Sequence, residues 1–261
     1  LTWGRHAAHD LQRVETLVSP SAVVQFVPRE TVDGVLHHRS KELVAYQDEK
    51  LAERYKALVA KVQAAEEQAR PGSSALALAV AKNYYHLLAY KDEYEVARLY
   101  TDSDFLKRVE EQFEGDYKLV FHLAPPTLAD KDPQSGELQK KEYGPWMLKA
   151  MRVLAKFRHL RGSKLDPFAR SHDRKLDREL IADYERIVEE ILVNLDLANH
   201  EAAIELASIP DQIRGFGHVR ERYLASARPR QAALLEDFRH RRPVSAPVAT
   251  KVRRTIAIIP G

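Results

Sequence analysis

Residues 173–195, DRKLDRELIADYERIVEEILVNL, decide the fold class of this chain. Apolar side chains recur in this stretch at intervals of three or four residues, which places them on one face of an α-helix. These residues are Leu176, Leu180, Ile181, Tyr184, Ile187, Val188, Ile191, Leu192 and Leu195. Charged residues fill most of the other positions. The stretch therefore predicts an amphipathic helix with one buried face.

Two further stretches upstream show the same helical spacing. From Glu30 to Arg70 there is no proline, and apolar residues mostly follow one another at intervals of three or four. This pattern predicts one long helix or two helices in tandem. Pro71-Gly72-Ser73-Ser74 ends it, and its serines are suited to cap a new helix over about 74–92. The composition of that helix indicates nearly complete burial.

The remaining elements are shorter. Helices are predicted at 94–100, from Asp102 or Ser103 to about Gly115, from Pro145, at 199–208, and from Asp211 to about Arg239. In the helix from Pro145, the expected inward set is Trp146, Leu148, Met151, Val153, Leu154 and Phe157. Residues 116–123, DYKLVFHL, alternate polar and apolar and predict a strand, and 124–142 read as an exposed hairpin or flap.

The predicted fold class is mainly α, an irregular multi-helix bundle with a small β element near residues 116–123. Three parts are expected along the chain. Residues 1–29 hold a short helix and a linker or brief strand, 30–240 form the helical domain, and 241–261 form a flexible tail or an added strand.

Composition excludes several classes of function. Apolar residues make up 44% and charged residues 30% of the 261, the balance of a soluble globular protein. No apolar run approaches the roughly 18 to 20 residues that a bilayer span needs, so no membrane association is expected and a cytoplasmic location is. The chain has no cysteine, which excludes disulfides and thiolate-ligated zinc or iron–sulfur clusters within it. A net charge of +3 gives no general reason to expect nucleic acid.

Motifs of a self-contained active site are also missing. Among the eleven histidines, His6 and His9 are spaced to share a metal, but no third ligand stands at a recognisable position, so no metal site is predicted. The ten glycines never form a dinucleotide or P-loop motif, and no serine lies in a nucleophile elbow. No catalytic residue is therefore assigned.

Residues 209–221, IPDQIRGFGHVRE, form the first candidate site. A helix start rich in glycine and basic side chains is suited to hold an anion or to contact a partner. The candidate residues are Arg214, Gly215, Gly217, His218 and Arg220. The alternative, which is favoured, is that the glycines permit a kink or close helix contact and that the charges pair with nearby acids.

Residues 82–98, KNYYHLLAYKDEYEVAR, form the second candidate site. Interleaved basic and aromatic residues are found in nucleic-acid interfaces, but here the helical spacing and the neighbouring acids favour a core stripe with paired charges. Lys82, Tyr85, Lys91 and Tyr94 are the candidates for an interdomain surface.

Five segments carry a family resemblance. In order they are KNYYHLLAYKDEYEVARLYTD, FEGDYKLVFHLAPP, YGPWMLKAMRVLAKFRHLRGSKLDPF, LIADYERIVEEIL and IPDQIRGFGHVRE. Together they resemble the carboxy-terminal domain of the long, fused indolepyruvate ferredoxin oxidoreductases of bacteria, over about residues 40–240. LTWGRHAAHDLQRVE resembles the closing helices of the preceding gamma-type domain, so we expect the chain, which opens without Met, to be a piece of a longer protein.

The resemblance implies a parent enzyme that oxidatively decarboxylates arylpyruvates to acyl-CoA and passes the electrons to ferredoxin. Thiamine diphosphate, magnesium and 4Fe–4S clusters are implied for other domains, and no cofactor is expected in this chain. Its expected role is accessory, in contact with the other domains of a homo-oligomer. The alternatives are a domain that contributes an anion site for CoA or a carboxylate, and a free-standing helical interaction module.

Overall fold

The computed structural model describes residues 30–101, 105–113, 115, 118–123, 139–215 and 217–240, and for Phe105, Glu110 and His218 it describes the backbone alone. By its internal contacts the chain divides into two compact units, Leu1–Thr31 and Val32–Gly261. The fold below is that of the second unit. The helix, linker and tail expected within 1–29 and 241–261 lie outside the described residues.

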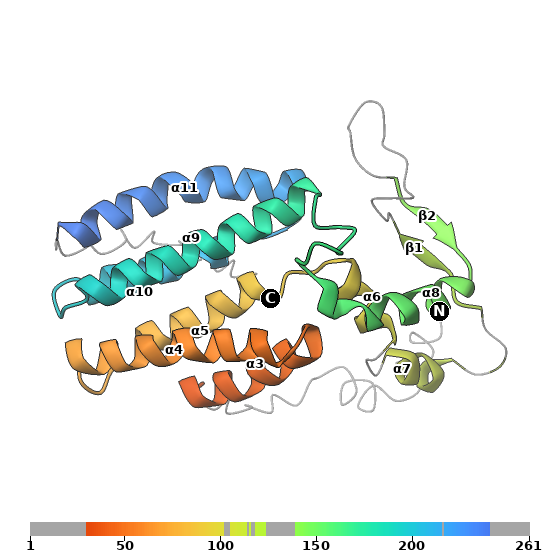
Figure 1. Cartoon of the computed structure of the whole chain (residues 1–261), viewed down its shortest axis with the longest axis horizontal. Helices are drawn as coiled ribbons and strands as arrows, with labels where there is room; N and C mark the ends of the chain where they lie inside the picture. The colour runs from red at the N-terminus through yellow and green to blue at the C-terminus, as the bar shows by residue number, and fades with distance from the viewer. Residues whose placement is uncertain are drawn as a thin grey trace, which may run out of the picture. The chain divides into compact units, whose positions relative to one another are not determined.

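Most helices of the second unit form one bundle around α5. They are α3 (Val32–Tyr46), α4 (Glu49–Ala69), α5 (Ala75–Leu88), α9 (His172–Asn194), α10 (His200–Ala207) and α11 (Gly217–Arg239), with a 3₁₀ turn, η2 (Ile209–Gln212), before α11. The central helix α5 contacts α3, α4, α9, α10 and η2 (Figure 1). Its sequence explains this position, because alanines alternate with larger apolar residues and allow neighbouring helices to come close.

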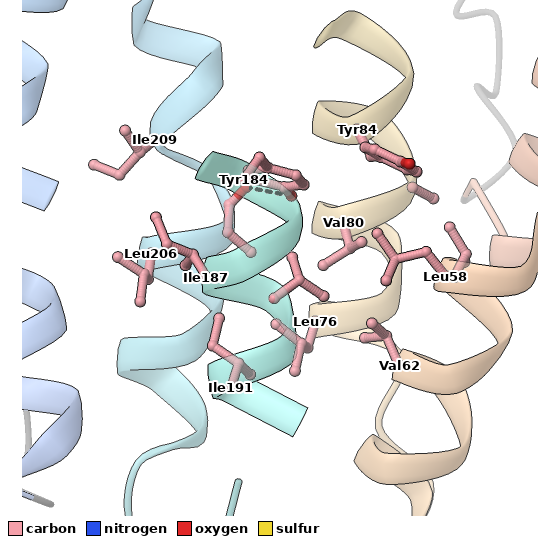
Figure 2. Close-up of a cluster of buried hydrophobic side chains, with 14 of the residues drawn as sticks. Leu58, Val62, Leu76, Val80, Tyr84, Tyr184, Ile187, Ile191, Leu206 and Ile209 are labelled. Atoms are coloured by element: carbon pink, nitrogen blue, oxygen red, sulfur yellow. Dashed lines mark hydrogen bonds between the residues drawn. The ribbon is translucent and has the colours of Figure 1, made fainter. Parts of the chain in front are cut away.

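Figure 2 shows the centre of this bundle, where side chains from four helices and η2 meet. α4 contributes Leu58 and Val62, α5 contributes Leu76, Val80 and Tyr84, and α9 contributes Tyr184, Ile187 and Ile191, with Leu206 and Ile209 beyond them. Of the nine residues expected on the buried face of α9, six are buried and the other three pack partly against the core. The prediction for α9 is confirmed.

Local signals end and start these helices, although the serine cap expected for α5 is not formed: Ser74 is its N-cap residue but makes no side-chain capping hydrogen bond. The 30–70 stretch forms two helices because Asp48 interrupts it and caps α4, its carboxylate accepting the Leu51 N–H at 2.8 Å. α4 and α5 are joined at Pro71-Gly72, where Gly72 has a positive φ of 78°. Ser171 caps α9 by accepting the Arg174 N–H at 3.4 Å.

The part of the sequence between α5 and α9 forms a smaller cluster of elements. It comprises α6 (Glu93–Thr101), α7 (Phe105–Gln112), strands β1 (Phe121–Leu123) and β2 (Lys141–Tyr143), α8 (Trp146–Lys156) and the 3₁₀ turn η1 (Arg158–Leu160). The strands pair antiparallel with Phe121 opposite Tyr143, which confirms a small β element, although β1 is shorter than the 116–123 expected. Most of the predicted 124–142 hairpin lies outside the described residues.

The orientation predicted for α8 is half wrong. Met151 is buried as expected, but it shares the buried face with Met147 and Ala155. Trp146, Val153 and Phe157, all expected inside, are 56%, 57% and 46% exposed. The cause is that α8 carries apolar residues at helical spacing on two faces, and periodicity alone does not tell which face meets α6.

The predicted fold class is confirmed: the protein is mainly α with one small antiparallel sheet. Among the described residues, no helix combines the length and the apolar character that crossing a bilayer would require.

Candidate functional site

The two candidate segments of the sequence meet at one cleft of about 470 Å³. It is formed where the end of α5 and the turn after it face α9 and the connection from η2 to α11. Its described lining consists of His86, Leu87, Ala89, Tyr90, Lys91, Asp177, Leu180, Asp211, Ile213, Arg214, Gly215 and Arg220. The segments are brought together because η2 packs against α5. Two predicted surfaces therefore contribute to a single site.

Arg214 lies on the exposed rim of this cleft. Its Nη2 donates to the Asp211 carboxylate at 2.5 Å, and its Nε donates to the Asp211 carbonyl oxygen at 2.9 Å. Side chains three residues apart are close at this turn, so the pair is local. The pairing with a nearby acid, the favoured interpretation of the sequence, is what the structure shows for this arginine.

Gly215 has the backbone conformation that turns the chain from η2 into α11. Its φ is +92°, and a Cβ atom at this position would lie 2.8 Å from Cγ1 of Val219. A larger residue would meet both backbone strain and a steric overlap. Gly217, with φ of +52°, begins α11, and the side chain of His218 lies outside the described residues.

Arg220 is buried at the base of the cleft. Its Nη1 donates to the Asp177 carboxylate, and its Nη2 donates to the Asp173 carbonyl oxygen at 3.3 Å. Asp177 also accepts a hydrogen bond from Arg174 at 2.7 Å. Burial raises the pKa of Asp177 above its ordinary value, although the two arginines oppose this shift. The Nε of Arg220 is buried and has no hydrogen-bond partner in the described part of the chain.

The four residues proposed as an interdomain surface have different positions. Lys82 and Lys91 are exposed, and Lys91 lines the cleft. Tyr85 is half-buried, and the Arg39 guanidinium lies over its ring, 4.3 Å from the ring centre. Tyr94 is 1% exposed and its hydroxyl donates to Asp166 at 3.1 Å, so its side chain is no part of the surface. The structure therefore contradicts Tyr94 as an interdomain contact and agrees with the core stripe that the spacing favoured.

A buried ion pair that the sequence did not reveal connects the bundle with the smaller cluster. Arg161, which follows η1, donates to both Asp92 carboxylate oxygens, from Nε at 2.6 Å and from Nη2 at 2.8 Å. Its Nη1 donates to the Tyr46 carbonyl oxygen at 2.7 Å, and its guanidinium lies 3.6 Å from the Tyr46 ring centre. One side chain thus joins the end of α3, the start of α6 and the turn after α8.

A second buried group, also missed, lies at the start of α5. The fully buried Glu66 carboxylate accepts from the Leu76 and Ala77 N–H groups at 2.9 and 2.8 Å. His200 Nε2 lies 2.8 Å from it, and Arg70 Nη1 lies 3.1 Å from His200 Nδ1. Because arginine only donates, Nδ1 accepts and Nε2 donates to Glu66. The contact has the form of a catalytic dyad, but both side chains are sealed from solvent and hold α4, α5 and α10 together.

The outer face of α8 presents a different kind of surface. The exposed Trp146, Val153 and Phe157 follow one another at intervals of seven and four, which places them along one line of the helix. Lys149, Arg152 and Lys156 are exposed on the same helix. No acidic residue occurs from position 145 to 165. The face is therefore both apolar and basic.

Within the described ranges, no group of three or more histidine and carboxylate side chains is placed to hold a metal ion. A 4Fe–4S cluster requires thiolate ligands, which this cysteine-free chain does not have. The residues present do not fit such a cluster.

The model of a family described as "Family of unknown function (DUF6537)" matches residues 32–233, which include the bundle, the smaller cluster and the cleft. No curated protein and no solved structure matches the chain. Since the match covers well over half of the 261 residues, the chain belongs to the DUF6537 family, whose function is unknown.

Proposed function

We propose that this chain is the accessory carboxy-terminal domain of a thiamine-diphosphate-dependent indolepyruvate (2-oxoacid):ferredoxin oxidoreductase. It positions catalytic domains that are encoded elsewhere in the enzyme and supplies no catalytic residue itself. The proposal is supported by the five ordered segments that resemble such enzymes, all of which lie within the residues matched by the family. Thiamine diphosphate, magnesium and iron–sulfur clusters then belong to the other domains, and ferredoxin accepts the electrons in the cytoplasm.

The exposed apolar face of α8 is the observation that carries the accessory role. Trp146, Val153 and Phe157 expose about half of their surfaces, although each is of a type that folding normally buries. Aligned along one helix, they form the kind of patch that another domain covers. An exposed tryptophan at its end is typical of the residues that dominate contact energies.

The basic residues of α8 indicate the character of the covering surface. Lys149, Arg152 and Lys156 lie around the apolar line, and no acid in 145–165 compensates them. A complementary surface has an apolar centre with acidic residues at its rim. We propose that a catalytic domain of the same enzyme provides it.

The test uses the full-length enzyme that contains this domain. Trp146→Ser together with Val153→Ser should weaken the domain contact by about 30-fold or more, since a buried aromatic anchor contributes about 2 kcal/mol or more. The expected results are faster release of the domain by limited proteolysis and a several-fold fall in indolepyruvate-dependent ferredoxin reduction.

Val193→Ser is the matched control, because Val193 is 83% exposed on α9 and far from α8 in the sequence. It should leave both measurements unchanged. Equal proteolysis and activity in the double variant would exclude α8 as the contact. Absence of any 2-oxoacid oxidation in the cofactor-loaded parent protein would exclude the proposed enzyme.

A further inference from the structure

The cleft between α5, α9 and the start of α11 has a composition suited to a ligand. Its volume of about 470 Å³ falls within the roughly 300 to 1,000 Å³ of small-molecule sites. We propose that it binds a small organic anion, with one carboxylate or phosphate group attached to an apolar body. This inference goes beyond the accessory role and does not depend on it.

Among the described residues that line the cleft, one cationic side chain has no partner. Lys91, Arg214 and Arg220 face two carboxylates, Asp177 and Asp211. Asp211 is paired with Arg214, and Asp177 is paired with Arg220 and with Arg174 behind it. Lys91 is exposed and forms no hydrogen bond or ion pair within the described residues. Its ammonium group is therefore available to a ligand.

Other acids near these arginines lie outside the cleft lining. Glu93 approaches Arg174 at 3.2 Å, and Asp173 approaches Arg220 at 3.9 Å. Their negative charges offset the positive charges of Arg174 and Arg220 and leave that of Lys91 unbalanced. The site as a whole is thus suited to a ligand with one anionic group, and not to a ligand with several, which would meet Asp177 and Asp211 as well.

Arg214 also offers hydrogen-bond donors to a ligand in the cleft. Arg214 uses its Nε and Nη2 on Asp211, which leaves the Nη1 hydrogens at the exposed rim for another acceptor. An anion held between Lys91 and Arg214 would receive charge-assisted hydrogen bonds from two segments of the chain. Gly215 sets this arrangement, because its positive φ turns the chain between Arg214 and α11.

Part of the cleft lining is apolar. Leu87, Leu180 and Ile213 line the cleft and also an adjoining hollow of about 30 Å³. Tyr90 adds a half-buried ring to the same lining. A bare phosphate ion would leave this part of the lining uncovered, whereas a ligand with a ring or short chain would bury it. The ligand class is therefore an anion with an apolar body.

The test is isothermal titration calorimetry of the protein with four probes: benzoate, phenyl phosphate, inorganic phosphate and neutral benzyl alcohol. Benzoate or phenyl phosphate should bind at one site, and the tighter of the two identifies the anionic group. Inorganic phosphate and benzyl alcohol should each bind at least about tenfold more weakly than the better aromatic anion, since each lacks one half of the recognition.

Two variants and a control locate the site. Lys91→Gln and Arg214→Gln should each weaken binding of the better aromatic anion about tenfold or more. Both residues are exposed, so the fold should survive, as circular dichroism would verify. Lys50→Gln removes an equally exposed lysine of α4 outside the cleft and should leave the affinity unchanged. Binding by none of the anions, or equal affinity in the protein and the Lys91→Gln variant, would overturn the proposal.

Discussion

Replacing Glu66 with alanine should lower the free energy of unfolding by about 3–5 kcal/mol, the cost of leaving the partners of a buried charge unpaired. The carboxylate accepts hydrogen bonds from two N–H groups at the start of α5, from the Ser73 hydroxyl at 2.8 Å and from His200. Alanine removes all four acceptor contacts at once and leaves a cavity. Urea unfolding followed by circular dichroism measures the loss.

Glu67→Ala is the control for this change. Glu67 is the next residue along α4, is exposed, and accepts one hydrogen bond from the Gly72 N–H at 3.1 Å. Its replacement should cost less than about 1 kcal/mol. Similar losses for the two variants would show that the buried carboxylate does not hold α4, α5 and α10 together.

The same carboxylate should make stability depend on pH. Burial acts to raise the pKa of Glu66, but hydrogen bonds from Ala77, Leu76, His200 and Ser73 outweigh it, and the pKa lies below its ordinary value of 4.5. The unfolded state then binds the proton more readily than the folded state. The stabilisation is therefore complete above the unfolded pKa and is lost as the pH falls through the folded pKa. Urea midpoints measured above and below pH 4.5 should show this fall, and Glu66→Gln should show a flatter profile.

Arg161→Met should have the second large effect, also about 3–5 kcal/mol, because it leaves the buried Asp92 carboxylate without its partner. Three hydrogen bonds and the contact with the Tyr46 ring are lost together. Differential scanning calorimetry measures the change. Arg170→Met, which removes an exposed arginine, should leave the melting temperature nearly unchanged.

A double variant separates the charge from the packing. Asp92→Asn keeps a side-chain acceptor for the Glu95 N–H that begins α6, now 2.8 Å from the Asp92 carboxylate. Combined with Arg161→Met, it removes the unpaired charge, so the double variant should be more stable than Arg161→Met alone. If the double variant is the less stable of the two, the unpaired carboxylate is not the source of the loss.

The helices of the bundle were predictable because the spacing of apolar residues within each stretch of sequence shows which face is buried. In α9 one apolar face recurs over six turns. In the 30–70 stretch the spacing predicts helix throughout but does not distinguish one helix from two, and the break is at Asp48. α8 was not predictable in the same way. With apolar residues on two faces, its orientation depends on which face packs on α6, and that is a tertiary property.

The candidate site was predictable only in parts. Its two segments each carried an unusual content of basic residues and glycine or tyrosine, but nothing local indicated that Lys91 and Arg214 would line the same cleft. Tyr94 agrees with the core stripe that the helical spacing favoured and not with the interdomain surface, because its side chain turns inward to Asp166, 72 residues away. Glu66 and His200 are 134 residues apart, and each looks unremarkable in its own stretch of sequence.

The central position of α5 has a consequence for synthesis on the ribosome. α3, α4 and α5 emerge before α9, α10 and η2, which also contact α5 and follow only after the smaller cluster has been translated. At about 5 to 20 residues per second, this delay is on the order of ten seconds. During that interval one side of α5, the most apolar helix of the bundle, is exposed on the nascent chain. The solubility of the nascent chain then depends on another molecule that covers this surface.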